Sequence, residues 1–258
     1  MNTWHGLALK RAPHRSVVAP VVASVAASVL TALVALAGCA SNGPDMAGTA
    51  LGTGPVESAA AEEPALVASG VGVIAEGCSL VANLGSGVVV ERSAQVATAA
   101  HTVRGASMLT VVDAEGRQHP ASVTSFDKDS DLALLDVPTL SAPPLSIGTA
   151  RVGPATLITW RRTDGVTQQL VDVTRLLKIN IEDIYTDEVV QRTGMEVDGE
   201  VIVGQSGGPV VDASGEVIGI IYATSKDRGA VGFATDHTEL RELIEARSPD
   251  GVANGRCP

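Results

Sequence analysis

Aromatic side chains are scarce in this chain, which has two Phe, two Tyr and two Trp among 258 residues. Hydrophobic residues nevertheless make up 45% of the sequence, so a core has to be built mainly from small and branched aliphatic side chains. Abundant Val and Thr favour strands, and abundant Gly favours turns. The composition therefore predicts a compact β-rich body and excludes long amphipathic helices as its main theme.

Positive charge is also in short supply. Three of the 18 Lys and Arg residues and none of the 29 Asp and Glu residues lie in the first 39 positions, so the remainder carries 15 basic and 29 acidic side chains, a net charge of −14. Such a surface offers little that pairs with phosphate backbones. We therefore expect no nucleic-acid partner, and the acidic surface indicates solubility outside the cell.

Recognisable cofactor motifs are missing as well. The sequence has neither the Cys and His spacing of a metal site nor a glycine-rich phosphate-binding pattern, and no internal repeat is visible. We therefore expect neither a metal nor a cofactor.

Residues 1–38 have the pattern of a secretory signal. Lys10, Arg11 and Arg15 precede an uncharged stretch from 16 to 37. This stretch is long enough to span a bilayer, so a permanent transmembrane helix is the alternative. Pro20 and the many small residues weaken such a span. The pattern therefore predicts export and removal of the segment.

The uncharged stretch ends in Leu36-Ala37-Gly38-Cys39, which resembles the bacterial lipobox. The resemblance implies cleavage before Cys39, a diacylglycerol on its thiol and a fatty acid such as palmitate on its new amino group. Several acyl chains together anchor a protein stably, whereas one alone binds marginally. Residues 39–65, rich in Ala, Gly, Ser, Pro and Glu, then read as a flexible tether. We expect a protein held by lipid at the outer face of a bacterial cell membrane.

The folded body is predicted over residues 66–258. Short apolar runs alternate there with turn residues, which predicts strands over 66–75, 85–91, 108–113, 132–137, 154–160, 200–204, 209–223 and 230–236. The run Ala142-Pro143-Pro144 divides them into two halves, about 66–141 and 145–235. This division fits two small β-barrels joined by a crossing segment.

Two helices are expected besides the strands. One lies near residues 98–103, and its first turn carries His101. The other closes the chain: Asp236 can cap it, Glu239 stands in capping-box position, and an apolar stripe of Leu240, Leu243 and Ile244 can pack against the body.

Three local motifs carry candidate chemistry. They are Thr98-Ala99-Ala100-His101, then Asp131 followed by the apolar run 132–135, and then the glycine-rich run 204–208 around Ser206. Their order of His, Asp and Ser is the order of the chymotrypsin triad, which differs from the orders in subtilisins and α/β-hydrolases. No strand-to-helix pattern follows Ser206, as the hydrolase nucleophile elbow would require.

These motifs, together with the GSGVVV run over 85–90, resemble trypsin-fold serine peptidases, and within them the bacterial HtrA/Deg-like group. The separations of 30 residues from His101 to Asp131 and of 75 from Asp131 to Ser206 also resemble its short-looped members. The resemblance covers about 85–234. It implies an all-β fold of two six-stranded barrels with a C-terminal helix, and a serine endopeptidase that acts on proteins or peptides.

The chemistry assigns a role to each residue type. Ser206 is the nucleophile, His101 the general base that takes its proton, and Asp131 the carboxylate that orients the imidazole and stabilises its charged form. By resemblance, the N–H groups of Gly204 and Ser206 form the oxyanion hole. Gln205 departs from the family pattern, which has Asp or Asn, and this affects the resting geometry of the loop.

Other residues compete for these roles. Asp127, Asp129 and Asp136 are alternatives to Asp131, but only Asp131 directly precedes an apolar strand that would bury it. His119 and His237, in a turn and at a helix start, are read as structural or surface residues.

Substrate specificity is assigned by resemblance alone. The residue six positions before the nucleophile, here Glu200, often forms the base of the side-chain pocket in trypsin-like enzymes, where a buried carboxylate would favour basic side chains. A solvent-facing Glu200 in a turn is the favoured alternative. The strand with Ile221, Tyr222 and Ala223 and the segment 229–233 are expected to form the pocket wall, where an extended substrate could add as a strand.

Two features leave the biology open. The HtrA group usually carries PDZ domains, and none is expected here, so an oligomeric state is not assigned. A catalytically silent, protease-fold binding protein of the cell surface is the alternative function, because Gln205 and the lack of a recognisable activation sequence allow an inactive oxyanion loop.

Cys78 and Cys257 remain once Cys39 is lipidated. An exported protein meets an oxidising environment, where two unpaired thiols are a liability, so we predict a disulfide between them. A free or intermolecularly paired Cys257 is the alternative.

Overall fold

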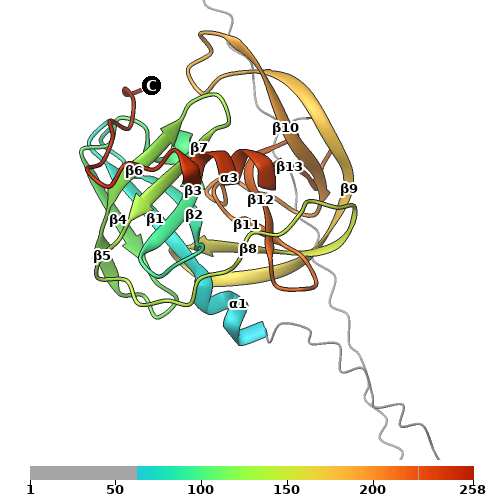
Figure 1. The fold of residues 1–258 in the computed structure, drawn as a ribbon, viewed down its shortest axis with the longest axis horizontal. Helices are drawn as coiled ribbons and strands as arrows, with labels where there is room; N and C mark the ends of the chain where they lie inside the picture. The colour runs from blue at the N-terminus through green and yellow to red at the C-terminus, as the bar shows by residue number, and fades with distance from the viewer. Residues whose placement is uncertain (1–62, 226) are drawn as a thin grey trace, which may run out of the picture. The chain divides into compact units, whose positions relative to one another are not determined.

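The structure, a computed structural model, describes residues 63–225 and 227–258. Its elements are strands with three short helices (Figure 1): α1 Glu63–Ser69, β1 Gly70–Glu76, β2 Asn83–Val89, β3 Gln95–Ala99, α2 Ala100–Val103, β4 Met108–Val112, β5 Gln118–Pro120, β6 Ser122–Asp127, β7 Leu132–Asp136, β8 Gly153–Arg161, β9 Gly165–Glu182, β10 Val189–Asp198, β11 Pro209–Val211, β12 Val217–Thr224, β13 Val231–Asp236 and α3 His237–Glu245.

The first half of the body is one antiparallel sheet in the order β5-β4-β1-β2-β3-β7-β6. Its two outer strands, β5 and β6, follow each other in the chain and are separated only by Ala121. Pro120 has no N–H to donate, and the strand breaks just after it. The broken strand pairs with β4 on one side and β7 on the other, so it closes the sheet into a barrel and accounts for seven segments where six were predicted.

The second half is a closed six-stranded barrel in the order β10-β13-β12-β11-β8-β9. Its longest strand is β9, and Figure 1 shows β9 and β10 as a long hairpin that curves along this barrel. Together the two barrels and α3 confirm the predicted double-barrel class with a C-terminal helix.

Apolar side chains fill each barrel and also the layer between the barrels. The sequence of β7 is apolar without alternation because both faces of this strand are buried. Ala133 and Leu135 face the core of the first barrel, whereas Leu132 and Leu134 join the cluster between the barrels. Strand β3 behaves alike, because Val96 and Ala97 divide between the same two clusters. Both faces of these strands are therefore buried, which fixes their register.

Helix α3 closes the layer between the barrels with Leu240 and Leu243. Asp236 caps it as predicted, since its side chain accepts a hydrogen bond from the Thr238 backbone N–H. The capping box does not form: the Glu239 carboxylate instead accepts bonds from the N–H and hydroxyl of Thr193 on β10 at 2.9 and 3.0 Å. A tertiary partner has replaced the local one.

The predicted set of strands is wrong in several places. Residues 66–69 belong to α1 rather than to the first strand, and Leu66 packs into the cluster between the barrels. Residues 200–204 form a turn, because Gly204 has a φ of +91° and the Gln205 N–H bonds back to the Ile202 carbonyl. The predicted run 209–223 is two strands, β11 and β12, joined by a turn, and β5, β6, β9 and β10 were not predicted at all.

The expected signal segment, Cys39 and almost all of the tether lie outside the described residues. In the described part of the chain, no helix combines the length and the hydrophobicity needed to cross a bilayer.

Candidate active site

His101 and Asp131 meet at the edge of the first barrel. Strand β3 ends at Ala99, and the single turn of α2 presents His101. Its imidazole Nδ1 lies 2.7 Å from Asp131 Oδ2, and its backbone N–H donates to Asp131 Oδ1 at 2.8 Å. This double contact orients the ring and leaves Nε2 as the nitrogen that can accept a proton.

Asp131 is buried, with 4% of its surface exposed, and its backbone has a φ of +58°. That left-handed conformation costs a non-glycine residue about 1–2 kcal/mol. The neighbouring loop compensates: the Asp131 carbonyl accepts from the Ala100 N–H at 3.0 Å, and the Ser130 hydroxyl donates to Asp127 at 2.6 Å. Of the competing carboxylates, Asp127 supports this loop, and Asp129 is exposed and bonded to Lys128.

The Ser206 loop of the second barrel lies directly against the first. The Ser206 carbonyl accepts a hydrogen bond from the Ser86 N–H at 2.7 Å, while the Ser86 hydroxyl accepts from the Trp160 N–H at 2.9 Å. Ser86 therefore joins β2 to both β8 and the nucleophile loop. Ser86 lies in the GSGVVV run of the sequence, and that run alone did not indicate this bridging role.

The loop before Ser206 leaves two amide hydrogens without partners. Within the described residues, neither the Gly204 N–H nor the Ser206 N–H donates to another described group, whereas those of Gln205, Gly207 and Gly208 do. Gln205 holds this shape through its buried side chain, which accepts from the Ile202 N–H at 2.9 Å and donates to the Thr159 hydroxyl at 3.2 Å. In the described part of the chain, the N–H of Ser206 and the N–H two residues before it are therefore both free, as an oxyanion hole requires.

Gly207 shows how tightly this loop is packed. Its φ is +89°, and a Cβ there would lie 2.0 Å from the Ser86 carbonyl oxygen and 2.4 Å from the Thr98 hydroxyl. Gly204 has a similar φ of +91°, yet a Cβ there would meet no atom within 4 Å. Both glycines supply a backbone conformation, but only Gly207 also supplies space.

We expect Gly207→Ala to destabilise the protein by more than about 3 kcal/mol, because steric overlap adds to backbone strain. Gly204→Ala, the matched control, should cost no more than about 1–3 kcal/mol, which is the strain alone. Thermal unfolding of the purified variants measures both. Equal melting temperatures for the two variants would contradict the contact with Ser86.

The predicted substrate-contacting residues differ in exposure. Ile221 and Tyr222 are buried and Ala223 is half-buried, all on β12, and the Ile221 N–H donates to the Gly208 carbonyl at 2.9 Å. The side chain of Glu200 is exposed, while its carbonyl accepts from the Gln169 amide at 2.7 Å. The structure therefore places no buried Glu200 carboxylate at the base of a pocket.

A buried carboxylate anchors the loop between β12 and β13. Glu196 on β10 lies 2.6 Å from both Arg175 and Arg228, and Arg228 belongs to that loop. The two guanidinium groups, Arg228 first, lower the pKa of Glu196 to about 2. Glu196 therefore remains ionised at neutral pH and fixes the base of the loop from which segment 229–233 continues.

Two hollows reach predicted site residues. One of about 300 Å³ is lined by His101, Thr102, Asn83 and Cys78 among others, and one of about 190 Å³ is lined by Gly204, Val203 and Trp160 among others. The first borders the candidate base, and the second borders the candidate oxyanion loop. This is the arrangement in which side chains of an extended peptide could be received.

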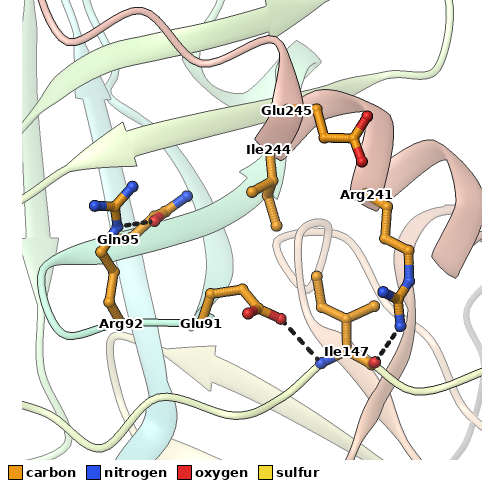
Figure 2. A pocket seen from close by; sticks show the side chains of 7 residues that line it. All are labelled: Glu91, Arg92, Gln95, Ile147, Arg241, Ile244 and Glu245. Carbon is orange, nitrogen blue, oxygen red and sulfur yellow. Dashed lines mark hydrogen bonds between the residues drawn. The ribbon is translucent and has the colours of Figure 1, made fainter.

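A third hollow, of about 350 Å³, contains none of the predicted site residues. Figure 2 shows its charged lining: Glu91 accepts from the Ile147 N–H at 3.4 Å, and Arg241 donates to the Ile147 carbonyl at 2.5 Å. These bonds join α3 and the turn after β2 to the segment between the barrels. They serve the packing of the two halves.

Among the described residues, one group of acids has the spacing of a metal site: Asp129, Asp183 and Glu188. Lys128 Nζ lies within 2.7 to 3.2 Å of all three, so an ammonium group fills the place of a cation. The two other histidines in the described part of the chain are structural: His119 lies between Asp113 and Thr139 at 3.0 Å from each, and His237 accepts from the Ala150 N–H.

The structure contains the predicted disulfide. Cys78 and Cys257 are joined with their Cα atoms 5.4 Å apart, across 179 positions of sequence. The bond places the tail beyond α3 against the turn that follows α2.

Two antiparallel β-barrels, with a His-Asp pair on one and a glycine-rich serine loop of the other packed beside it, define the chymotrypsin-like class of folds. The family model described as trypsin-like peptidase domain matches residues 85–220. The chain therefore belongs to the trypsin-like peptidase family.

Named relatives agree with this family. The chain is 31% identical over 203 residues to the serine protease Rv3671c of Mycobacterium tuberculosis, covering 77% of this chain and 50% of that protein. It is 31% identical over 162 residues to the chloroplastic Protease Do-like 1 of Arabidopsis thaliana, covering 58% and 36%. The chain thus spans half or less of the length of these curated relatives.

Solved structures agree on the fold. The active form of the Rv3671c protease superposes with a TM-score of 0.71 at 27% identity, covering 79% of this chain and 92% of that one. Its inactive form gives 0.62, covering 72% and 91%. The HtrA-type protease AlgW with a tripeptide gives 0.60 at 25% identity, covering 71% and 61%.

Proposed function

We propose that the chain is a serine endopeptidase in which His101, Asp131 and Ser206 form the catalytic triad. The observation that carries the proposal is the double contact between His101 and Asp131, with the Ser206 loop packed against the same barrel edge through Ser86. The order of the motifs, His before Asp before Ser, supports the assignment.

In this mechanism the Ser206 hydroxyl attacks the carbonyl carbon of a peptide bond, and His101 Nε2 takes its proton. The buried Asp131 carboxylate stabilises the resulting imidazolium. The Gly204 and Ser206 N–H groups donate to the oxyanion of the tetrahedral intermediate. Its collapse expels the amine, which receives the proton from His101 and leaves an acyl-Ser206 ester that water then hydrolyses.

An active resting loop is part of the proposal. Two observations support it: the unpaired N–H groups of Gly204 and Ser206, and the higher TM-score against the active than against the inactive form of the Rv3671c protease. Gln205 takes over loop support from the Asp or Asn of the family pattern. A fluorophosphonate probe tests this directly, since it labels only an activated serine. Labelling of the wild type and not of Ser206→Ala is expected; an unlabelled wild type would instead favour the silent binding protein.

We also propose that the enzyme works at the cell envelope on protein or peptide substrates, as residues 66–258 tethered through 39–65 to a lipid on Cys39. The basic start, the uncharged stretch and the lipobox resemblance support this. Strand β12 beside the nucleophile loop supports substrate binding in an extended conformation.

The lipid anchor can be tested on the full chain in a bacterial host. Metabolic labelling with a fatty-acid analogue should mark the wild type and direct it to the membrane fraction, because several acyl chains anchor stably. Cys39→Ala should lose the label, whereas Cys78→Ser, the matched control, should keep it. An unlabelled wild type cleaved at another position would contradict the proposal.

A further inference from the structure

Arg192 on β10 is a buried arginine without an ionic partner among the described residues. Only 3% of its surface is exposed, and it belongs to none of the ion pairs found in that part of the chain. A buried, unpaired cation is costly, so other groups must compensate its charge.

Two backbone carbonyls and one aromatic ring provide this compensation. Arg192 Nε donates to the Asp129 carbonyl, and one terminal nitrogen donates to the Lys128 carbonyl at 3.5 Å. The guanidinium carbon lies 5.2 Å from the centre of the Tyr222 ring on β12. Arg192 therefore joins two strands of the second barrel to a loop of the first.

This loop is the one that carries Asp131. The carbonyls that Arg192 binds belong to the residues two and three positions before Asp131, whose left-handed φ makes its placement depend on its surroundings. A displacement of the loop would move the carboxylate away from the His101 N–H and from Nδ1. No other side chain of the second barrel among the described residues bonds to these two carbonyls.

Arg192 and Asp131 also act on the same phenol. Burial raises the pKa of Tyr222 to about 12, the positive charge of Arg192 opposes the rise, and the negative charge of Asp131 adds to it. Both residues therefore lie close enough to Tyr222 to act on its hydroxyl, and the guanidinium of Arg192 stacks on the ring itself.

We propose that Arg192 is a positioning residue for the catalytic pair: it fixes the loop that bears Asp131 and places a permanent positive charge beside that loop. The inference rests on the proposed triad. Arg192 touches neither substrate nor reacting atoms, and it acts through Asp131 on His101.

Other titratable groups surround the pair, and the two cations among them have hydrogen-bond partners of their own. Lys128 is bound by three carboxylates, and Arg104 on the turn after α2 donates to the Ile184 carbonyl. The groups on the elements packed around His101 and Asp131 are Asp127, Lys128 and Asp129 of the loop before β7, Asp183, Tyr185 and Glu188 of the β9–β10 turn, Arg104, and Tyr222. Their charges are the same in every variant below.

The test uses Arg192→Met, Arg192→Lys and, as matched control, Arg151→Met in the full chain. Arg151 is an exposed arginine just before β8 that pairs with Asp212, away from the candidate site. Peptide hydrolysis is measured from about pH 5 to pH 9, below the melting temperature of each variant, and the acid limb of kcat/KM reports protonation of the free enzyme's base.

Arg192→Met should lower kcat at least about tenfold, with KM changed less than about threefold, because chemistry and not binding suffers. Its acid limb should move to higher pH, since the imidazolium is favoured once a nearby positive charge is removed. Arg192→Lys should keep the acid limb of the wild type but lose part of kcat, because an ammonium group cannot bind both carbonyls in the geometry of a guanidinium. Arg151→Met should leave both unchanged.

An active Arg192→Met with the wild-type acid limb would overturn the proposal. If Arg192→Met does not fold, Arg192→Lys decides: a wild-type kcat, or an acid limb shifted as in a charge-neutral variant, would overturn it equally. Failure of the triad itself gives a different result, namely a wild type that a fluorophosphonate does not label.

Discussion

Ser206→Ala is expected to abolish peptide hydrolysis, with kcat lowered by roughly 10⁶, while the protein stays folded. The nucleophile, the base and the carboxylate act as one unit, so removal of the hydroxyl removes the whole covalent route. Ser206 is half-buried, and two backbone hydrogen bonds that the substitution leaves in place hold its loop. The Ser206 carbonyl accepts from the Ser86 N–H, and the Gly207 N–H donates to the Ile221 carbonyl. The measurement is turnover of a peptide substrate, with the circular dichroism spectrum as the test of folding.

His101→Ala should be nearly as severe, for the same reason. Ser214→Ala is the matched control, because this serine lies on the exposed turn after β11 and should leave the rate unchanged. A Ser206→Ala protein that retained more than a small fraction of the wild-type rate would contradict the triad. Two controls exclude a host protease as the source of a residual rate. The rate should be insensitive to a fluorophosphonate, and an empty-vector preparation should show no hydrolysis.

The local parts of the site could be predicted from the sequence because they depend on short-range chemistry. A histidine one turn after a buried strand and an aspartate just before an apolar run are visible as patterns of neighbouring residues. The apolar run after Asp131 is unbroken because both faces of β7 are buried. That burial is what places the carboxylate at the edge of the layer between the barrels.

The residues that hold the site together were missed because their partners are distant in sequence. Arg192 bonds to a carbonyl 63 residues earlier, and Ser86 bonds to Trp160, 74 residues later. No spacing rule connects such positions, because they are brought together only by the packing of one barrel on the other. Arg192 lies in β10, which was not predicted as a strand, so nothing in the sequence indicated that this arginine is buried.

Strand β9 did have a signal that was overlooked. Leu177, Ile179 and Ile181 alternate with polar residues and are half-buried in the structure, as expected for a strand with one covered face. The opposite error occurred at 200–204, where a short apolar run is not a strand and Val203 is almost fully exposed. Apolar runs of this length do not reveal whether a partner strand is present.

Loss of the disulfide between Cys78 and Cys257 is expected to lower the melting temperature by on the order of 10 °C. The bond closes a loop of 179 residues, for which the chain-entropy model gives about 5 kcal/mol as an upper value, and removal of native disulfides costs about 2–5 kcal/mol. For a body of this size each kcal/mol corresponds to about 2–4 °C.

Noncovalent contacts of the tail limit the loss. The side-chain amide of Asn254 donates to the Val103 and Ala106 carbonyls at 2.9 Å, and the backbone carbonyl of Asn254 accepts from the Gly105 N–H at 2.9 Å. These bonds hold the tail on the turn after α2, the helix that carries His101. Without the disulfide, the unfolded chain is no longer cross-linked, so the tail loses more conformational entropy when these bonds form.

The double variant Cys78→Ser/Cys257→Ser isolates this effect, and thermal unfolding in the absence of reductant measures it. Cys39→Ser in the same assay is the matched control and should leave the melting temperature unchanged. Reductant should lower the melting temperature of the wild type toward that of the double variant and should not affect the double variant itself. Thiol counting on the unfolded, unreduced protein should find neither Cys78 nor Cys257 free. An unchanged melting temperature in the double variant would mean that the contacts of Asn254 hold the tail without help from the covalent bond, and two free thiols in the wild type would contradict the bond itself.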